Sequence, residues 1–187
     1  MTSAAGSKGF NLIGSSGTDT ITATGKADTF TIASSGQGNL DVLDGAGGAD
    51  TLQLSAGSHV FASDANFKNI ETVLANTAGS SVNLSAQTEG FTITGGDGID
   101  TIIGGDGVDI ITGGAGNDTN NGEAGKDTLQ GGDGVDSIIG GAGVDSITAG
   151  AGNDVISVDD HSDFQTSGGA ELSLIHISEP TRLLSIA

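Results

Sequence analysis

An aspartate stands at every ninth position of the sequence between residues 95 and 157, seven times in succession. The chain of 187 residues has 24 acidic residues against five Lys and Arg, so its formal net charge is −19. A regular row of carboxylates on so acidic a chain requires a cation to neutralise it, and carboxylates with backbone carbonyls are the ligands of hard divalent cations. The row consists of Asp100, Asp109, Asp118, Asp127, Asp136, Asp145 and Asp154.

These aspartates belong to an ungapped nine-residue repeat. From Gly95 the units read GGDGIDTII, GGDGVDIIT, GGAGNDTNN, GEAGKDTLQ, GGDGVDSII, GGAGVDSIT and AGAGNDVIS. The fourth position is glycine and the sixth is aspartate in all seven units. A register held this long indicates a repeat architecture, in which each unit stacks on its neighbours.

The unit matches GGxGxDxUx, where U is a large aliphatic residue, and in this it resembles the RTX (repeats-in-toxin) family of calcium-binding repeats. The resemblance implies an all-β parallel β-roll, a β-solenoid in which six residues of each unit form a turn and three form a strand. Two units then make one coil. Glycines at positions one, two and four permit positive φ and expose turn carbonyls as ligands.

The expected calcium ligands are the position-six aspartates and the turn glycines, with the position-three acids partly engaged. Besides the seven aspartates, they are Gly96, Gly98, Gly105, Gly107, Gly114, Gly116, Gly132, Gly134, Gly141, Gly143, Asp97, Asp106 and Asp133.

In such a roll, alternate turns stack about 4.8 Å apart, and a calcium ion fits between two carboxylates at that spacing. The predicted pairs are Asp100 with Asp118, Asp109 with Asp127, Asp118 with Asp136, Asp127 with Asp145, and Asp136 with Asp154. This predicts about five ions. Residues 95–157 carry a net charge of −10, from ten Asp and one Glu against one Lys, which five divalent cations would balance.

Position eight should point inward and build aliphatic ladders that alternate between two sheets, from Ile102, Ile111, Leu129, Ile138, Ile147 and Ile156. Asn120 interrupts one ladder with an amide. Glu123 replaces a glycine and Lys126 adds a cation in the same unit, so we expect the sites that use Asp127 to be the weakest.

Residues 1–53 contain four degenerate units with Asp19, Asp28, Asp41 and Asp50 at position six and Ile21, Phe30, Leu43 and Leu52 at position eight. We expect coils held by strand pairing with little or no metal; two further calcium sites are the alternative. Residues 54–94 lose the register but alternate like short strands at 71–74, 81–84 and 91–94. This spacer is similar to β-strand repeats of bacterial surface-layer and adhesin-like proteins, and a plain solenoid spacer is the alternative.

Residues 158–171 are acidic and could cap the roll through Phe164. The following LSLIHISEPTR, Leu172 to Arg182, looks like the in-frame translation of a sequencing adapter. We therefore exclude 172–187 from fold reasoning. A short terminal helix that ends at Pro180 is the alternative.

Several function classes find no support in the sequence. The acidic charge disfavours nucleic acid and anionic membranes, and no apolar run is long enough for a membrane span. No HExxH or GxSxG motif is present, so we expect no enzyme activity. His59, His161 and His176 are isolated and expected at the surface; Glu71 and Glu89 are expected on a solvated strand face rather than in a carbohydrate site.

The resemblance implies a calcium-binding module of a secreted or cell-surface bacterial protein, with an adhesin- or surface-layer-like role and type I secretion machinery as a partner. The alternative is the folding and secretion module of an exported lipase, metalloprotease or polysaccharide epimerase. An ice-binding face would require a threonine array on a flat sheet or in the turns. Position five, which reads Ile, Val, Asn, Lys, Val, Val and Asn, does not supply one.

Overall fold

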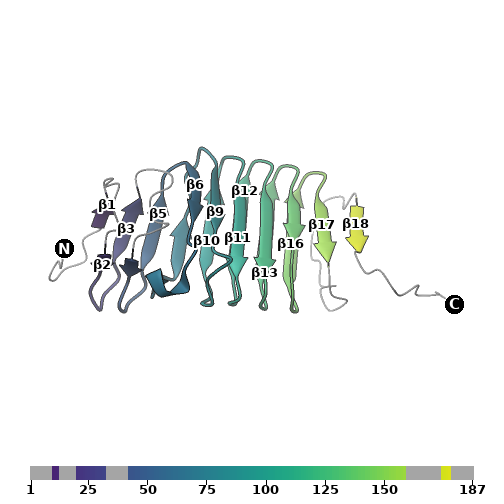
Figure 1. The fold of residues 1–187 in the computed structure, drawn as a ribbon. Helices are drawn as coiled ribbons and strands as arrows, with labels where there is room; N and C mark the ends of the chain where they lie inside the picture. Colours follow the sequence, from purple (N-terminus) through teal and green to yellow (C-terminus); the bar gives the residue numbers. More distant parts are fainter. Residues whose placement is uncertain (1–9, 13–19, 33–41, 159–173, 178–187) are drawn as a thin grey trace.

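The computed structural model describes residues 10–12, 20–32, 42–158 and 174–177, which form a parallel β-solenoid (Figure 1). Among the described residues every strand pair is parallel, and the one helical element is a single 3-10 turn, η1 (Asp64–Asn66). This confirms the predicted all-β parallel roll. Of the residues singled out above, Asp19, Asp41, Phe164 and His161 lie outside the described residues.

The coils stack their strands into two long sheets and one short sheet. Sheet A has eight strands: β1 (Phe10–Leu12), β3 (Thr29–Ile32), β5 (Thr51–Leu54), β8 (Thr72–Leu74), β10 (Thr92–Gly96), β12 (Ile110–Ala115), β14 (Thr128–Asp133) and β16 (Ser146–Ala151). Sheet B has three: β2 (Thr20–Thr22), β4 (Val42–Asp44) and β7 (Phe67–Lys68). Sheet C has seven: β6 (Gly57–Val60), β9 (Ser80–Asn83), β11 (Thr101–Gly105), β13 (Thr119–Glu123), β15 (Ser137–Ile139), β17 (Val155–Val158) and β18 (Leu174–Ile177).

The register gives the length of a coil. From β10 to β17 each paired residue lies opposite the residue 18 positions later, as Thr101 does with Thr119 and Thr119 with Ser137. Two nine-residue units therefore make one coil, as the resemblance implied. Upstream coils are longer: Thr29 pairs with Thr51, and Thr51 with Thr72. Sheet A runs unbroken through residues 54–94, and β8, β9 and β10 form where alternation predicted short strands.

The strands of the repeat are longer than the three residues expected. They begin at position seven as predicted, but most continue into the first positions of the next unit, and Gly96, Gly114, Gly132 and Gly150 pair in register across sheet A. The turn is correspondingly shorter, because glycine backbones at these positions remain hydrogen-bonded to their neighbours in the sheet.

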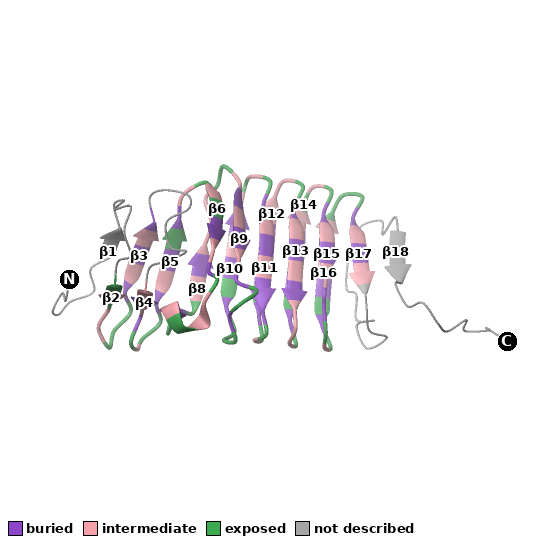
Figure 2. Cartoon of the chain, viewed as in Figure 1, coloured by how far each residue is buried: buried purple, intermediate pink, exposed green. Residues whose placement is uncertain are grey.

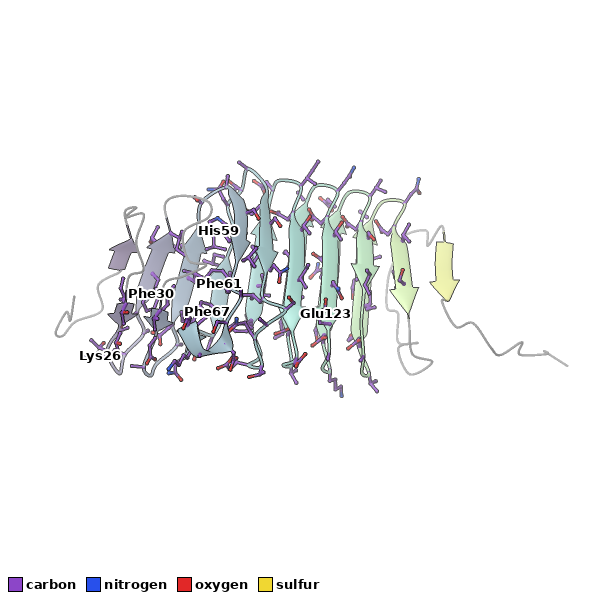
Figure 3. All side chains as sticks on the ribbon, in the orientation of Figure 1. Lys26, Phe30, His59, Phe61, Phe67 and Glu123 are labelled. Atoms are coloured by element: carbon purple, nitrogen blue, oxygen red, sulfur yellow. The ribbon has the colours of Figure 1, made fainter. Side chains whose placement is uncertain are left out.

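The core is a continuous cluster of buried residues along the stacked strands, which Figure 2 colours purple. All six predicted position-eight residues are at most 2 % exposed, and Asn120 is fully buried between Ile102 and Ile138. Upstream, Phe30, Leu43 and Leu52 are also buried. The core widens there into an aromatic cluster in which the ring of Phe67 lies 4.6 Å from that of Phe61 and 5.6 Å from that of Phe91. Figure 3 labels Phe61 and Phe67.

Strand β18 belongs to the segment that we set aside as adapter-like. Its backbone pairs in parallel with β17, from Val155 with Leu174 to Val158 with Ile177. The structure thus extends sheet C by one strand at residues 174–177, and Pro180 lies outside the described residues.

Candidate metal centres

Each position-six aspartate is buried and belongs to a ladder that runs along one edge of the solenoid. All seven are at most 2 % exposed. On the sheet C edge, the backbone N–H of Asp100 donates to Oδ1 of Asp118 at 2.9 Å, and that of Asp136 donates to Oδ1 of Asp154 at 2.9 Å. On the sheet A edge, Asp109 N–H donates to Asp127 Oδ1, also at 2.9 Å. The ladders bring together the residue pairs that the coil model predicted.

The second carboxylate oxygen of these aspartates, Oδ2, is not used in the ladder hydrogen bonds. Oδ2 of Asp100, Asp118, Asp127 and Asp136 is buried and makes no hydrogen bond within the described chain. Leaving a buried carboxylate oxygen without a partner is costly. A calcium ion would satisfy these atoms, because it accepts carboxylate oxygens in flexible geometries.

Each of these oxygens faces a cradle made by the glycine at position one. A Cβ placed on Gly113 would lie 2.5 Å from Oδ2 of Asp118 and 2.6 Å from the carbonyl oxygen of Gly131, one coil later. Absence of a side chain therefore keeps open a space where oxygens of two coils converge. The same pair of oxygens, an Oδ2 and a position-one carbonyl, surrounds the Cβ positions of Gly95, Gly104, Gly122 and Gly131.

The position-one residues were not among the predicted ligands, although six of the seven units have glycine there. The predicted glycines at positions two and four lie against backbone atoms of the preceding coil instead. A Cβ on Gly114 would collide with the carbonyl of Gly96, and one on Gly116 with that of Gly98. These glycines, at φ of 119° and 131°, let successive turns stack closely.

The position-three acids Asp97, Asp106 and Asp133 are exposed, and the charge of Asp133 helps to raise the pKa of the ladder residue Asp136. Among the described residues, no three Asp, Glu, His or Cys side chains converge on one point. A calcium ion at the ladder would therefore be held by carboxylate oxygens together with backbone carbonyls, which is a ligand set that calcium accepts.

Burial makes the charged form of these carboxylates expensive. It raises the pKa of Asp127 to about 7, with the Asp109 and Asp145 charges adding to the effect. Burial likewise raises the pKa of Asp100, Asp118 and Asp136. A bound divalent cation would reverse this effect by favouring the carboxylate form.

The sheet A ladder continues into the degenerate region with a residue that the sequence pattern did not reveal. Asp28 N–H donates to Asp50 Oδ1 at 2.7 Å, and Asp50 N–H donates to Glu71 Oε2 at 2.7 Å. Glu71 thus takes the ladder place of an aspartate, outside the nine-residue register. Phe91 has no carboxylate and interrupts the ladder, although its N–H still donates to Asp109 at 2.7 Å.

The fourth unit keeps the ladder despite its substitutions. Asp127 Oδ1 accepts from Asp109, and Asp127 N–H donates to Asp145 Oδ1 at 2.9 Å. Glu123 adopts a left-handed backbone with φ of 71°, held by its N–H to Asn121 Oδ1 at 3.1 Å and by Asn121 Nδ2 to its own Oε1 at 2.8 Å. A side-chain clamp therefore holds a conformation that other units give to glycine.

The prediction for His59 was wrong. This histidine is fully buried, where its Nε2 lies 2.9 Å from the carbonyl oxygen of Ser55, and burial lowers its pKa. It occupies an inward position of sheet C, opposite Val82. Glu71 and Glu89 are exposed, as expected for solvated positions; Glu71 bonds to Asp50, and Glu89 shares a side-chain hydrogen bond with Asp64.

Comparison with known families gives one match. A model of the RTX calcium-binding nonapeptide repeat fits the chain in four copies, at residues 13–31, 35–58, 92–119 and 121–156. Searches of curated proteins and of solved structures find no match. No helix among the described residues is long and apolar enough to cross a membrane. The four copies include two in the degenerate region and together span more than half of the sequence, and this chain therefore belongs to the family of RTX calcium-binding nonapeptide repeats.

Proposed function

We propose that this calcium-binding module is a non-enzymatic part of a secreted or cell-surface protein and that it folds when it meets calcium outside the cell. The observation that carries the proposal is the pair of carboxylate ladders, buried at both edges of the solenoid with an Oδ2 atom of Asp100, Asp118, Asp127 and Asp136 left unbonded within the described chain. Ions bound there would hold successive coils together.

The energetics favour coupling between calcium and folding. Carboxylates that repeat at about 4.8 Å repel each other by about 1 kcal/mol per contact in water and by more when desolvated. Six of the seven units offer one aliphatic side chain at position eight to offset this repulsion and the ordering entropy of a glycine-rich backbone. Calcium replaces each repulsion by a bridge, so that its binding free energy becomes folding free energy.

The expected affinity explains where folding would occur. Calcium sites of extracellular modules have dissociation constants of roughly 10⁻⁴ to 10⁻³ M. Resting cytosolic calcium is far below this range, whereas external media are close to it. The repeats would therefore stay extended inside the cell, ready to thread through type I secretion machinery, and fold after export as a structural element of an adhesin- or surface-layer-like protein.

Small-angle scattering of the full chain would test the proposal. In chelator we expect a radius of gyration near the roughly 45 Å of an unfolded chain of this length, and in millimolar calcium a marked decrease. Magnesium at equal ionic strength is the control for screening. Equal radii in chelator and in calcium would contradict export in an extended state.

A further inference from the structure

The outer face of sheet A carries a two-column array of threonines. Seven strands, from β3 to β16, each point two side chains outward. The parallel register places these side chains in line from coil to coil. The first column is Thr29, Thr51, Thr72, Thr92, Ile110, Thr128 and Ser146; the second is Thr31, Gln53, Leu74, Thr94, Thr112, Gln130 and Thr148. Threonine fills nine of these fourteen positions.

The chemistry of this face differs from that of the rest of the molecule. The chain has a net charge of −19, yet none of the fourteen positions is charged and none is aromatic. None of the fourteen side chains is buried, and within the described part of the chain no hydroxyl among them hydrogen-bonds to another residue. The described fold therefore does not use these hydroxyls, and they can hydrogen-bond to an external partner.

The fold fixes the spacing of the hydroxyls in two dimensions. Neighbouring coils place them about 4.8 Å apart along the solenoid. The two columns are about 6.6 Å apart, because they lie two residue steps apart along each strand. In Figure 1 the strands of this stack lie side by side as nearly parallel arrows, so the array is extended along the solenoid. Threonine also has restricted χ1 rotation, which limits the movement of each hydroxyl.

The regular, uncharged lattice of hydroxyl and methyl groups limits which partners this face can bind. Carbohydrate sites use aromatic rings and acids, neither of which this face has, and a protein partner would need larger apolar anchors than Ile110 and Leu74. Ordered water hydrogen-bonds to fixed hydroxyls, and the oxygen rows on faces of hexagonal ice repeat at an interval close to the strand spacing. We propose that the outer face of sheet A binds ice.

This array is difficult to recognise in the sequence. Only every second nine-residue unit contributes to sheet A, and strands β3, β5 and β8 lie outside the regular repeat. The array also uses positions seven and nine, whereas the turn position that we considered for an ice-binding face, position five, lacks threonine. The proposal goes beyond the proposed function and requires only the folded solenoid.

Sheet C provides an internal control. Its outward positions in β6 to β17 are a mixture: Ser58, Val60, Ser81, Asn83, Thr101, Ile103, Thr119, Asn121, Ser137, Ile139, Val155 and Ser157. Only two of these twelve are threonine, and they are paired neighbours, Thr101 with Thr119. On sheet A, Thr94 and Thr112 are likewise paired neighbours of intermediate exposure.

Partition of the full chain into slowly growing polycrystalline ice, at saturating calcium, tests the proposal. We expect the wild type to enter the ice and the double variant Thr94→Lys/Thr112→Lys to fall to the level of an excluded solute. The matched double variant Thr101→Lys/Thr119→Lys on sheet C should partition like the wild type. Circular dichroism with calcium verifies that each variant is folded.

Three results would overturn the proposal: exclusion of the folded wild type from ice, an equal loss in both double variants, or retention on crystalline cellulose or chitin that only the sheet A variant loses. The last would assign the face to polysaccharide instead. Because folding is followed separately in each sample, failure of ice binding is distinguishable from failure of calcium-driven folding.

Discussion

The backbone N–H of Asp118 donates a 2.8 Å hydrogen bond to Oδ1 of Asp136, the residue at the same position one coil later. Asp136 therefore has two roles: one carboxylate oxygen joins the coils, and the other, Oδ2, faces the position-one cradle at Gly131. Removing this side chain should affect both the stacking of coils and the binding of calcium.

The variant Asp136→Ala should lose about two of about five calcium ions, because the residue serves the sites above and below it. Isothermal titration calorimetry measures the stoichiometry. Val135→Ala is the matched control, since Val135 is an exposed residue of the same turn whose side chain has no oxygen, and it should keep all ions. A stoichiometry of one ion or none for the wild-type repeat would rule out the stacked-turn arrangement.

The variant Asn120→Ile should stabilise the calcium-loaded form by roughly 1 to 2 kcal/mol. Asn120 is fully buried; its Nδ2 donates to the carbonyl of Gln130 at 3.1 Å, but its Oδ1 has no hydrogen-bond partner within the described chain. Isoleucine would restore the ladder between Ile102 and Ile138. Thermal unfolding at saturating calcium measures the change.

Asn121→Ile is the control for this substitution, because Asn121 is only half-buried and clamps the left-handed Glu123. It should lower the melting temperature. If Asn120→Ile also melts at a lower temperature than the wild type, the single hydrogen bond to Gln130 outweighs the gain in apolar packing.

Acid should stabilise the calcium-free solenoid. Burial raises the pKa of Asp127 from an ordinary value of 3.8 to about 7, and that of Asp100 and Asp136 in the same direction. A carboxyl whose folded-state pKa is raised destabilises the fold at high pH, and this penalty disappears as the pH falls through the folded-state value toward the unfolded one. Between pH 7 and about 4, the folded fraction in chelator should therefore increase as the pH falls.

Calcium should reverse this dependence, since protons compete with the ion for the same oxygens. Circular dichroism across this pH range, once in chelator and once in calcium, measures both slopes. Slopes of the same sign would show that the ladder carboxylates are not the groups that bind the ion.

The periodic part of the fold could be predicted because each unit repeats the same physical constraints. Position-eight aliphatics such as Ile111 and Ile138 had to face inward, and the spacing of Asp100 and Asp118 matched the coil. Glu71 and His59 were not predictable in the same way, because coils of 20 or more residues shift which residue reaches the ladder or the core.

The glycine carbonyls illustrate another limit. The invariance of Gly98 and Gly107 suggested that position four supplies ligands, since glycine exposes its backbone. In the folded roll a Cβ at that position would collide with the backbone of the preceding turn, and the free carboxylate oxygen faces the position-one glycine, as at Gly113. Which carbonyls hold the ion stays a prediction. Composition alone cannot distinguish a glycine needed for stacking from one needed to leave room for an ion.

Far-UV circular dichroism of the full chain, first in chelator and then in millimolar calcium, tests most directly whether calcium drives folding of the repeats. We predict a weak, largely unfolded spectrum in chelator and a strong β spectrum after calcium is added, with no such gain for a variant in which Asp100, Asp118 and Asp136 are all changed to Ala. A β spectrum of equal strength in chelator and in calcium would contradict the account and leave a solenoid that folds without the ion.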